Sequence, residues 1–227
     1  MKIQILPDAD TVAAEAAKFI AAQARSTVAA RGRFVMAVSG GRTPWQMLRA
    51  LAREEVPWNG VHIAQVDERV APAGHTDRNL THLRESLSQA AIDPDHVHAM
   101  PVEELDLDKA ADSYAKSLQQ IAGAPPVLDL VHLGLGADGH TASLIPGDPV
   151  LEVSDRDVAM TGVYQGRRRM TLTYPLINRA ACVLWVVTGA EKREMLTRLR
   201  DGDDSIPGGR ISRDGVLVLA DRAAAGE

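Results

Sequence analysis

The sequence predicts an α/β fold: a mainly parallel, Rossmann-like sheet with helices on both faces, and a small β-rich lobe. Two observations predict this fold class. Short apolar runs typical of buried strands alternate with longer segments whose apolar residues recur at helical spacing. This alternation favours parallel strands joined by crossover helices. No repeat or linker-like segment divides the chain, so we expect one domain over residues 1–227.

The expected strands are short runs rich in Val, Ile and Leu, bounded by glycine or polar residues, as buried strands are. Two of these runs, 158–163 and 170–174, lie in the segment where we expect the β-rich lobe. In chain order the expected strands are 3–6, 34–39, 61–66, 97–100, 128–133, 158–163, 170–174, 182–188 and 216–220.

The expected helices lie between many of these strands. The first is long and rich in alanine, and the second has Thr43 as its cap and Pro44 as its first residue. For Asp77, capping the third is the alternative to a functional role. The expected ranges are 11–31, 44–54, 79–91, 103–122 and 191–200.

Composition narrows the class of partner. The formal net charge of −5 and the pI near 5.8 argue against a general nucleic-acid binder, which carries a basic excess. No apolar run approaches the roughly 20 residues of a membrane helix, and the first residues lack the apolar core of a signal peptide. The single cysteine, Cys182, cannot form an internal disulfide. We therefore expect a cytoplasmic protein, a monomer or weak homodimer, that binds neither nucleic acid nor membrane.

Three glycine or charge signals follow the expected strands that end near Val38, Val66 and Leu133. Ligands of parallel α/β sheets bind outside the carboxyl ends of the strands. We therefore expect these three segments to meet at one edge of the sheet and to form the functional site.

The first signal is Ser39-Gly40-Gly41, directly before an expected helix. Glycines let backbone N–H groups converge, and a helix start favours an anion, so a phosphate or a carboxylate fits. It is no Walker loop, because no Gly-Lys-Ser/Thr follows. The alternative is an ordinary capped turn between strand and helix.

The second signal is Asp67-Glu68-Arg69. Such a triplet taken alone is typical of a solvated turn. Its place at the same sheet edge favours a functional interpretation, in which the planar fork of Arg69 grips an anionic group.

The third signal is the segment 134–139, which ends in Asp138-Gly139 and is followed by His140. It matches Gly-x-Gly-x-x-Gly, but Pro146 stops any following helix and no acid-ended strand follows at the usual distance, which argues against a dinucleotide site. A metal site on Asp138 and His140 lacks a third ligand nearby. Histidine is the side chain best suited to move a proton near neutral pH. The alternative is a histidine at a helix start bonded to backbone; we favour catalysis.

Two further segments carry cations. The run Arg167-Arg168-Arg169 precedes a strand, so at least one of its side chains lies on each face. Lys192 lies in the first turn of an expected helix, where the helix dipole disfavours a cation unless it faces an anion. A plain surface lysine is the alternative.

These motifs, in this order, resemble those of the glucosamine-6-phosphate isomerase/6-phosphogluconolactonase family. The resemblance runs from Phe34 to about Lys192 and is most specific over 136–144. Where deaminases of the family continue after the histidine toward Ala-Phe-Asn-Glu, this chain continues Thr-Ala-Ser-Leu. The resemblance therefore implies the lactone-hydrolysing branch.

The implied reaction is hydrolysis of 6-phosphoglucono-δ-lactone without a metal or organic cofactor. His140 would be the general base, and Asp138 would orient its imidazole. The alternatives are a deaminase or aldose–ketose isomerase on a sugar phosphate, and a sugar-phosphate-binding module without catalysis. The residues expected to bind the substrate and its phosphate are Ser39, Gly40, Gly41, Arg69, Asn79, Arg169 and Lys192.

Overall fold

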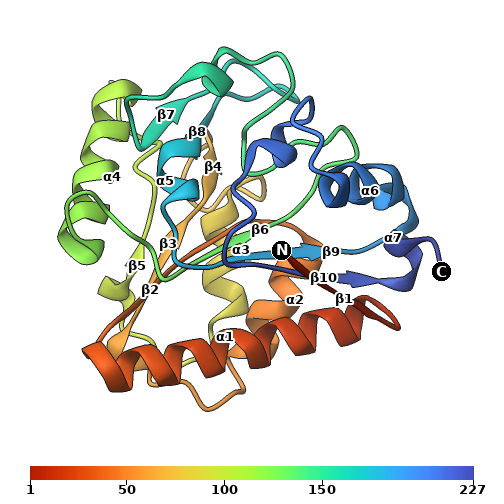
Figure 1. Cartoon of the computed structure of the whole chain (residues 1–227). Helices are drawn as coiled ribbons and strands as arrows, with labels where there is room; N and C mark the ends of the chain where they lie inside the picture. The colour runs from red at the N-terminus through yellow and green to blue at the C-terminus, as the bar shows by residue number, and fades with distance from the viewer.

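The structure is a computed structural model that describes residues 1–227, and its centre is a parallel sheet of seven strands (Figure 1). Five of the seven strands are buried along most of their length. The predicted fold class is thereby confirmed. In spatial order the strands are β1 (Lys2–Leu6), β10 (Val216–Asp221), β9 (Val183–Val187), β6 (Leu130–Leu133), β2 (Phe34–Val38), β3 (Val61–Gln65) and β5 (Val97–His98).

Helices cover both faces of this sheet, because its central strands alternate apolar side chains between two cores. In β2, Phe34 and Met36 face one core, while Val35 and Ala37 face the other. The first core contains α1 (Ala9–Arg31), α2 (Arg42–Leu51) and α3 (Asn79–Ser86). The second contains α4 (Leu107–Ala122), α5 (Tyr174–Asn178), α6 (Arg193–Asp201) and α7 (Arg222–Ala225). Short 3-10 turns occupy Trp58–Gly60, Pro94–His96, Pro149–Glu152, Ala190–Lys192 and Pro207–Arg210.

Helix α1 shows how local sequence sets these boundaries. Asp8 caps its start, with Oδ1 accepting a hydrogen bond of 2.7 Å from the Thr11 amide. Gly32 ends it with a left-handed φ of 74° that other residues adopt at a cost. Between these ends, fully buried alanines let the helix lie close to α2 and the sheet.

The predicted β-rich lobe is an antiparallel sheet of three strands that packs on the α4 side, at the top of Figure 1. Its strands are β7 (Val158–Met160), β8 (Arg169–Leu172) and β4 (Asp67–Arg69). The alternative of a solvated turn at 67–69 does not hold, because these residues pair with β8 and place Arg69 opposite Arg169.

Several predicted boundaries were also wrong. Gly41, with φ of 131°, is the N-cap of α2, and Thr43 instead lies 2.7 Å from the Thr188 hydroxyl. Arg78, rather than Asp77, is the N-cap of α3. Residues 173–174 leave the strand, since a short helix begins at Tyr174. No helix follows the segment 134–139; the chain continues there in turns.

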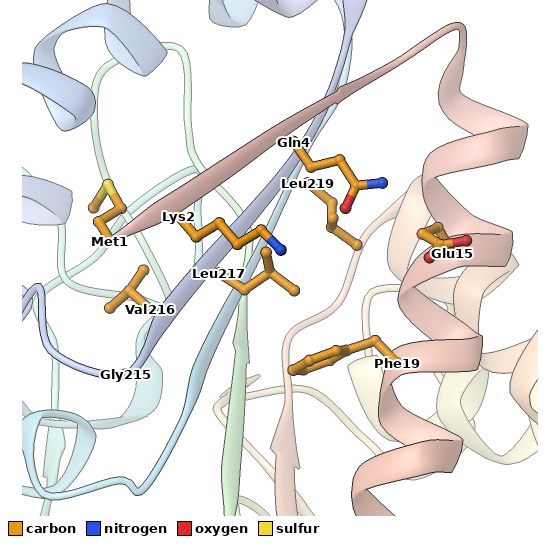
Figure 2. Close-up of a pocket in the computed structure, with 9 residues that line it drawn as sticks. All are labelled: Met1, Lys2, Gln4, Glu15, Phe19, Gly215, Val216, Leu217 and Leu219. Atoms are coloured by element: carbon orange, nitrogen blue, oxygen red, sulfur yellow. The ribbon is translucent and has the colours of Figure 1, made fainter.

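None of the helices combines the length and the apolarity that crossing a bilayer requires. The sheet ends on one side at β1, where a hollow of about 610 Å³ opens between the strand and α1 (Figure 2). Lys2 and Gln4 of β1 and Phe19 of α1 line this hollow together with Leu217 of β10.

Candidate active site

A cleft of about 200 Å³ lies at the carboxyl ends of β2, β3, β6 and β9. Strands β2 and β6 are neighbours in the sheet. After β2 the next strands are added on the β3 and β5 side, and after β6 they are added on the opposite side, as β9 and β10. The cleft therefore occupies the switch point at which open α/β sheets bind ligands. Its lining consists of Ser39, Gly40, Asp67, Arg69, Asn79, Gly134, Leu135, Gly136, His140, Ala142, Arg169 and Lys192.

Asp138 and His140 form a hydrogen-bonded pair at the end of this cleft. The Oδ1 atom of Asp138 lies 2.5 Å from His140 Nδ1 and also accepts a hydrogen bond of 3.1 Å from the His140 amide. Burial acts to raise the pKa of Asp138, but the neighbouring His140 outweighs it and holds that pKa below its ordinary value. The ionised carboxylate thus fixes a proton on Nδ1 and leaves Nε2 as the free ring nitrogen.

Glycine at position 136 makes room for this pair. A Cβ atom there would lie 2.1 Å from His140 Nδ1 and 2.5 Å from Asp138 Oδ1, well inside van der Waals contact. The Gly136 amide also donates a hydrogen bond of 2.8 Å to the His140 carbonyl and closes the turn. The alternative of a helix-start histidine does not hold, because His140 lies in a turn and lines the cleft.

Two arginines from the small sheet form the opposite part of the lining. Arg69 and Arg169 stand directly opposite each other on β4 and β8, so their side chains lie on the same face. The Nε atom of each is buried without a hydrogen-bond partner. Burial lowers the pKa of Arg169, and the carboxylate of Asp67 offsets part of that effect. Two adjacent guanidinium groups with unused donors are chemically suited to bind an anion.

Two buried carboxylates, Asp67 and Glu68, precede Arg69 in β4. Asp67 Oδ2 accepts a hydrogen bond of 2.7 Å from the Ser143 hydroxyl, and Asn79 Nδ2 donates to the Asp67 main-chain and side-chain oxygens. Glu68 is fully buried and turned away from the cleft. Its oxygens accept hydrogen bonds from the amides of Arg69, Asn79 and Leu80 and from the Gln65 side chain, and lie 3.1 Å from Arg78 Nε.

The Ser39-Gly40 turn forms the floor beside β2. The Ser39 amide donates to His132 Nδ1 at 3.3 Å, and its hydroxyl donates to the His132 carbonyl at 3.0 Å. Complete burial lowers the pKa of His132 to about 3, so this histidine is a neutral acceptor. A Cβ on Gly40 would lie 2.1 Å from Asn79 Oδ1, which explains why only glycine fits there.

Lys192 closes the cleft from the β9 side. It follows Gly189, whose amide lies 3.1 Å from each carboxylate oxygen of Asp221. Lys192 ends the 3-10 turn that precedes α6, rather than lying in the helix itself. Its ammonium group has no carboxylate partner within ion-pair distance in the structure.

The structure thus brings seven of the nine predicted site residues into the cleft lining, all except Asp138 and Gly41. Asp138 reaches the cleft through His140, whereas Gly41 serves as the helix cap. Sequence reasoning missed the buried Glu68 and Ser143, and it missed Tyr164, whose hydroxyl donates to Asp138 from 26 residues away. No spacing signal in the sequence connects these positions.

Other features of the molecule do not offer comparable chemistry. The wider hollow of Figure 2 lies at the starts of β1 and β10, the end of the sheet opposite the cleft, and lacks a paired acid and base. His62, His96 and His98 stack at the β5 edge, where burial lowers the pKa of His62 to about 4. No three His, Cys, Asp or Glu side chains converge as metal ligands.

Comparison with known proteins is consistent with this geometry. The family model described as glucosamine-6-phosphate isomerases/6-phosphogluconolactonase matches residues 7–219. A 6-phosphogluconolactonase of Nostoc sp. is 35% identical over 99% of this chain and 96% of its own length. One from Mycobacterium tuberculosis is 32% identical over 98% of this chain and 96% of its own length.

Solved structures agree as well. The 6-phosphogluconolactonase of Trypanosoma cruzi superposes with a TM-score of 0.89 at 26% identity, covering 100% of this chain and 96% of that one. The enzyme from Thermotoga maritima superposes with a TM-score of 0.86 at 27% identity, covering 97% of this chain and 98% of that one. On these matches, the chain belongs to the glucosamine-6-phosphate isomerase/6-phosphogluconolactonase family.

Proposed function

We propose that this protein hydrolyses 6-phospho-D-glucono-1,5-lactone to 6-phosphogluconate, the second step of the oxidative pentose phosphate pathway. The observation that carries the proposal is a single cleft in which a carboxylate-oriented imidazole faces two adjacent arginines with unused donors. Relatives that align over nearly the whole chain bear the name of this activity.

His140 is the general base of the proposed mechanism. With Nδ1 engaged by Asp138, Nε2 accepts a proton from a water molecule as that water attacks the lactone carbonyl. The tetrahedral intermediate then collapses, the bond from the carbonyl carbon to the ring oxygen breaks, and His140 returns the proton to that oxygen. The cations of the cleft stabilise the negative charge that develops on the carbonyl oxygen.

The phosphate group is held by two of the three cations Arg69, Arg169 and Lys192, and the third serves the carbonyl oxygen. Of the predicted amides of residues 39–41, those of Gly40 and Gly41 join the phosphate site, because the Ser39 amide is bonded to His132. These cations come from both sheets and surround one cleft, so they suit a substrate that carries its charge at one end. Asn79 is held at its edge by Asp67. The remaining polar lining includes Ser39 and the carboxylate of Asp67, groups that can hydrogen-bond sugar hydroxyls.

A specific observation favours the lactonase over a deaminase. The segment after His140 places Ser143 fully buried against Asp67, so it supplies no second acid to the imidazole.

Residues 1–227 are treated as one domain, because side chains of β7 and β8 belong to the same apolar cluster as those of β6 and β9.

The test is a pH-stat assay on freshly generated lactone, corrected for uncatalysed hydrolysis. We expect His140→Ala to lower kcat about 10²–10⁴-fold, the usual contribution of a general base, with an unchanged circular-dichroism spectrum. His82→Ala, on the surface of α3, is the matched control and should retain normal turnover. Near-normal turnover by folded His140→Ala protein, or release of ammonia from glucosamine 6-phosphate by the wild type, would contradict the proposal.

A further inference from the structure

Tyr164 touches both halves of the cleft. It lies in the loop between β7 and β8, and its hydroxyl donates a hydrogen bond of 3.2 Å to Asp138 Oδ2. Its ring meets that of His140 edge to face, with 5.7 Å between centroids. On the other side, the guanidinium carbon of Arg169 lies 4.9 Å from the same ring centroid. One side chain therefore contacts the acid, the imidazole and an arginine of the anion site.

We propose that Tyr164 is a positioning residue of this cleft. Its hydroxyl orients the Asp138 carboxylate toward the His140 ring, and its own ring independently positions the guanidinium group of Arg169. The inference rests on the proposed lactonase function and adds a residue to it. A carboxylate held only by the imidazole can rotate about its χ2 torsion. With Oδ2 bound to the tyrosine hydroxyl, Oδ1 remains directed at Nδ1. The ring supplies a cation–π contact to Arg169 that does not depend on the hydroxyl.

The loop is built to hold Tyr164 in this place. Tyr164 and Arg167 exchange backbone hydrogen bonds of 2.9 and 3.2 Å across a tight turn. Gln165 adopts a left-handed φ of 51°, a conformation that costs a non-glycine residue energy. Its side chain accepts a hydrogen bond of 3.2 Å from Arg169 Nη2. Gln165 is thus hydrogen-bonded to Arg169, the arginine that packs against the Tyr164 ring.

The protonation state of the hydroxyl suits this role. Burial raises the pKa of Tyr164, and the adjacent Asp138 carboxylate raises it further. The phenol therefore remains a donor throughout the neutral range. A donor beside an ionised carboxylate forms a charge-assisted hydrogen bond, which is stronger than one between neutral groups.

Two variants separate the hydroxyl from the ring. Tyr164→Phe removes the donor and keeps the ring, so we expect kcat to fall about 5- to 10-fold while KM changes less than about twofold. Tyr164→Leu removes both, so we expect the same fall in kcat and in addition a rise in KM of about 3- to 10-fold. Binding of the product, 6-phosphogluconate, measured by calorimetry should weaken in the Leu variant and not in the Phe variant.

A readout without turnover addresses positioning directly. In protein labelled with ¹⁵N-histidine, the ring nitrogens of His140 should change chemical shift when Tyr164 is replaced by Phe. The acid limb of the pH–rate profile of the Tyr164→Phe variant should also move relative to that of the wild type. Unchanged kcat, pH profile and ring shifts in Tyr164→Phe would overturn the inference, as would equal product affinity of the two variants. Loss of lactone hydrolysis by the wild type would instead refute the proposed function, which keeps the two failures distinguishable.

Discussion

The sharpest test of the architecture beneath the cleft is the substitution Glu68→Gln. Glu68 is fully buried, accepts four hydrogen bonds and lies 3.1 Å from the buried guanidinium of Arg78. The glutamine has the same shape, but its amide NH₂ points at donors and leaves Arg78 with only Glu103 as a carboxylate partner. Removing one member of a buried ion pair costs about 3–5 kcal/mol.

Because Glu103 still faces Arg78, we expect the lower end of that range, about 3 kcal/mol of unfolding free energy. For a chain of this size that corresponds to a fall in Tm of roughly 6–12 °C. Urea unfolding followed by tryptophan fluorescence measures the free energy, and calorimetry measures Tm.

Glu103→Gln is the matched control. It makes the same chemical change to the other partner of Arg78, but the Glu103 side chain is 52% exposed. Exposed ion pairs contribute about 0–1 kcal/mol, so the control should lose less than about 1 kcal/mol. If both variants lost the same stability, burial would not be what makes Glu68 matter, and the reasoning would fail.

Three further outcomes follow from the same geometry. Gly136→Ala should reduce kcat at least about 100-fold with the fold intact, because the new methyl group occupies the place of the His140 ring; wild-type turnover in this variant would contradict that packing. Lys192→Met should raise KM for the lactone about 10-fold with little change in kcat, as measured in the pH-stat; an unchanged KM would remove Lys192 from the binding site. His132 is neutral in the folded protein, where its pKa is about 3, and it binds a proton only in the unfolded chain as the pH falls below its ordinary pKa. The free energy of unfolding should therefore fall by about 2–3 kcal/mol between about pH 7.5 and pH 4.5. His132→Gln should flatten this pH dependence in urea titrations, and an equally steep dependence in that variant would exclude His132 as its source.

The sequence predicted the central sheet well, because runs of apolar residues and the glycines that end them are local signals. Runs such as 34–39 and 128–133 are followed directly by glycines, which mark the ends of strands whatever the tertiary context. The carboxyl ends of parallel strands lie at one edge of the sheet, which is why Ser39 and His140 were expected at the same edge. That they line one cleft depends on β2 and β6 being neighbours, and the sequence does not give this strand order.

The parts that sequence reasoning missed depend on contacts between distant segments. Asp67-Glu68-Arg69 is indistinguishable from a solvated turn until β8 supplies the hydrogen bonds that make it a strand. Glu68 is buried because amides from α3 surround it, and the triplet by itself contains no sign of them. Tyr164 meets Asp138 only because the loop between β7 and β8 folds over the cleft.

The backbone of Val66 bonds to both sheets beside the cleft. The Val66 amide donates to the Val38 carbonyl of β2 at 3.0 Å, while its own carbonyl accepts from the Leu172 amide of β8 at 2.8 Å. One residue therefore extends the central sheet and begins the small one. It fixes Arg69, three residues later, relative to both Ser39 and Arg169. The two arginines belong to the small sheet, whereas His140 follows β6 of the central sheet, so the cleft is formed where the two sheets meet.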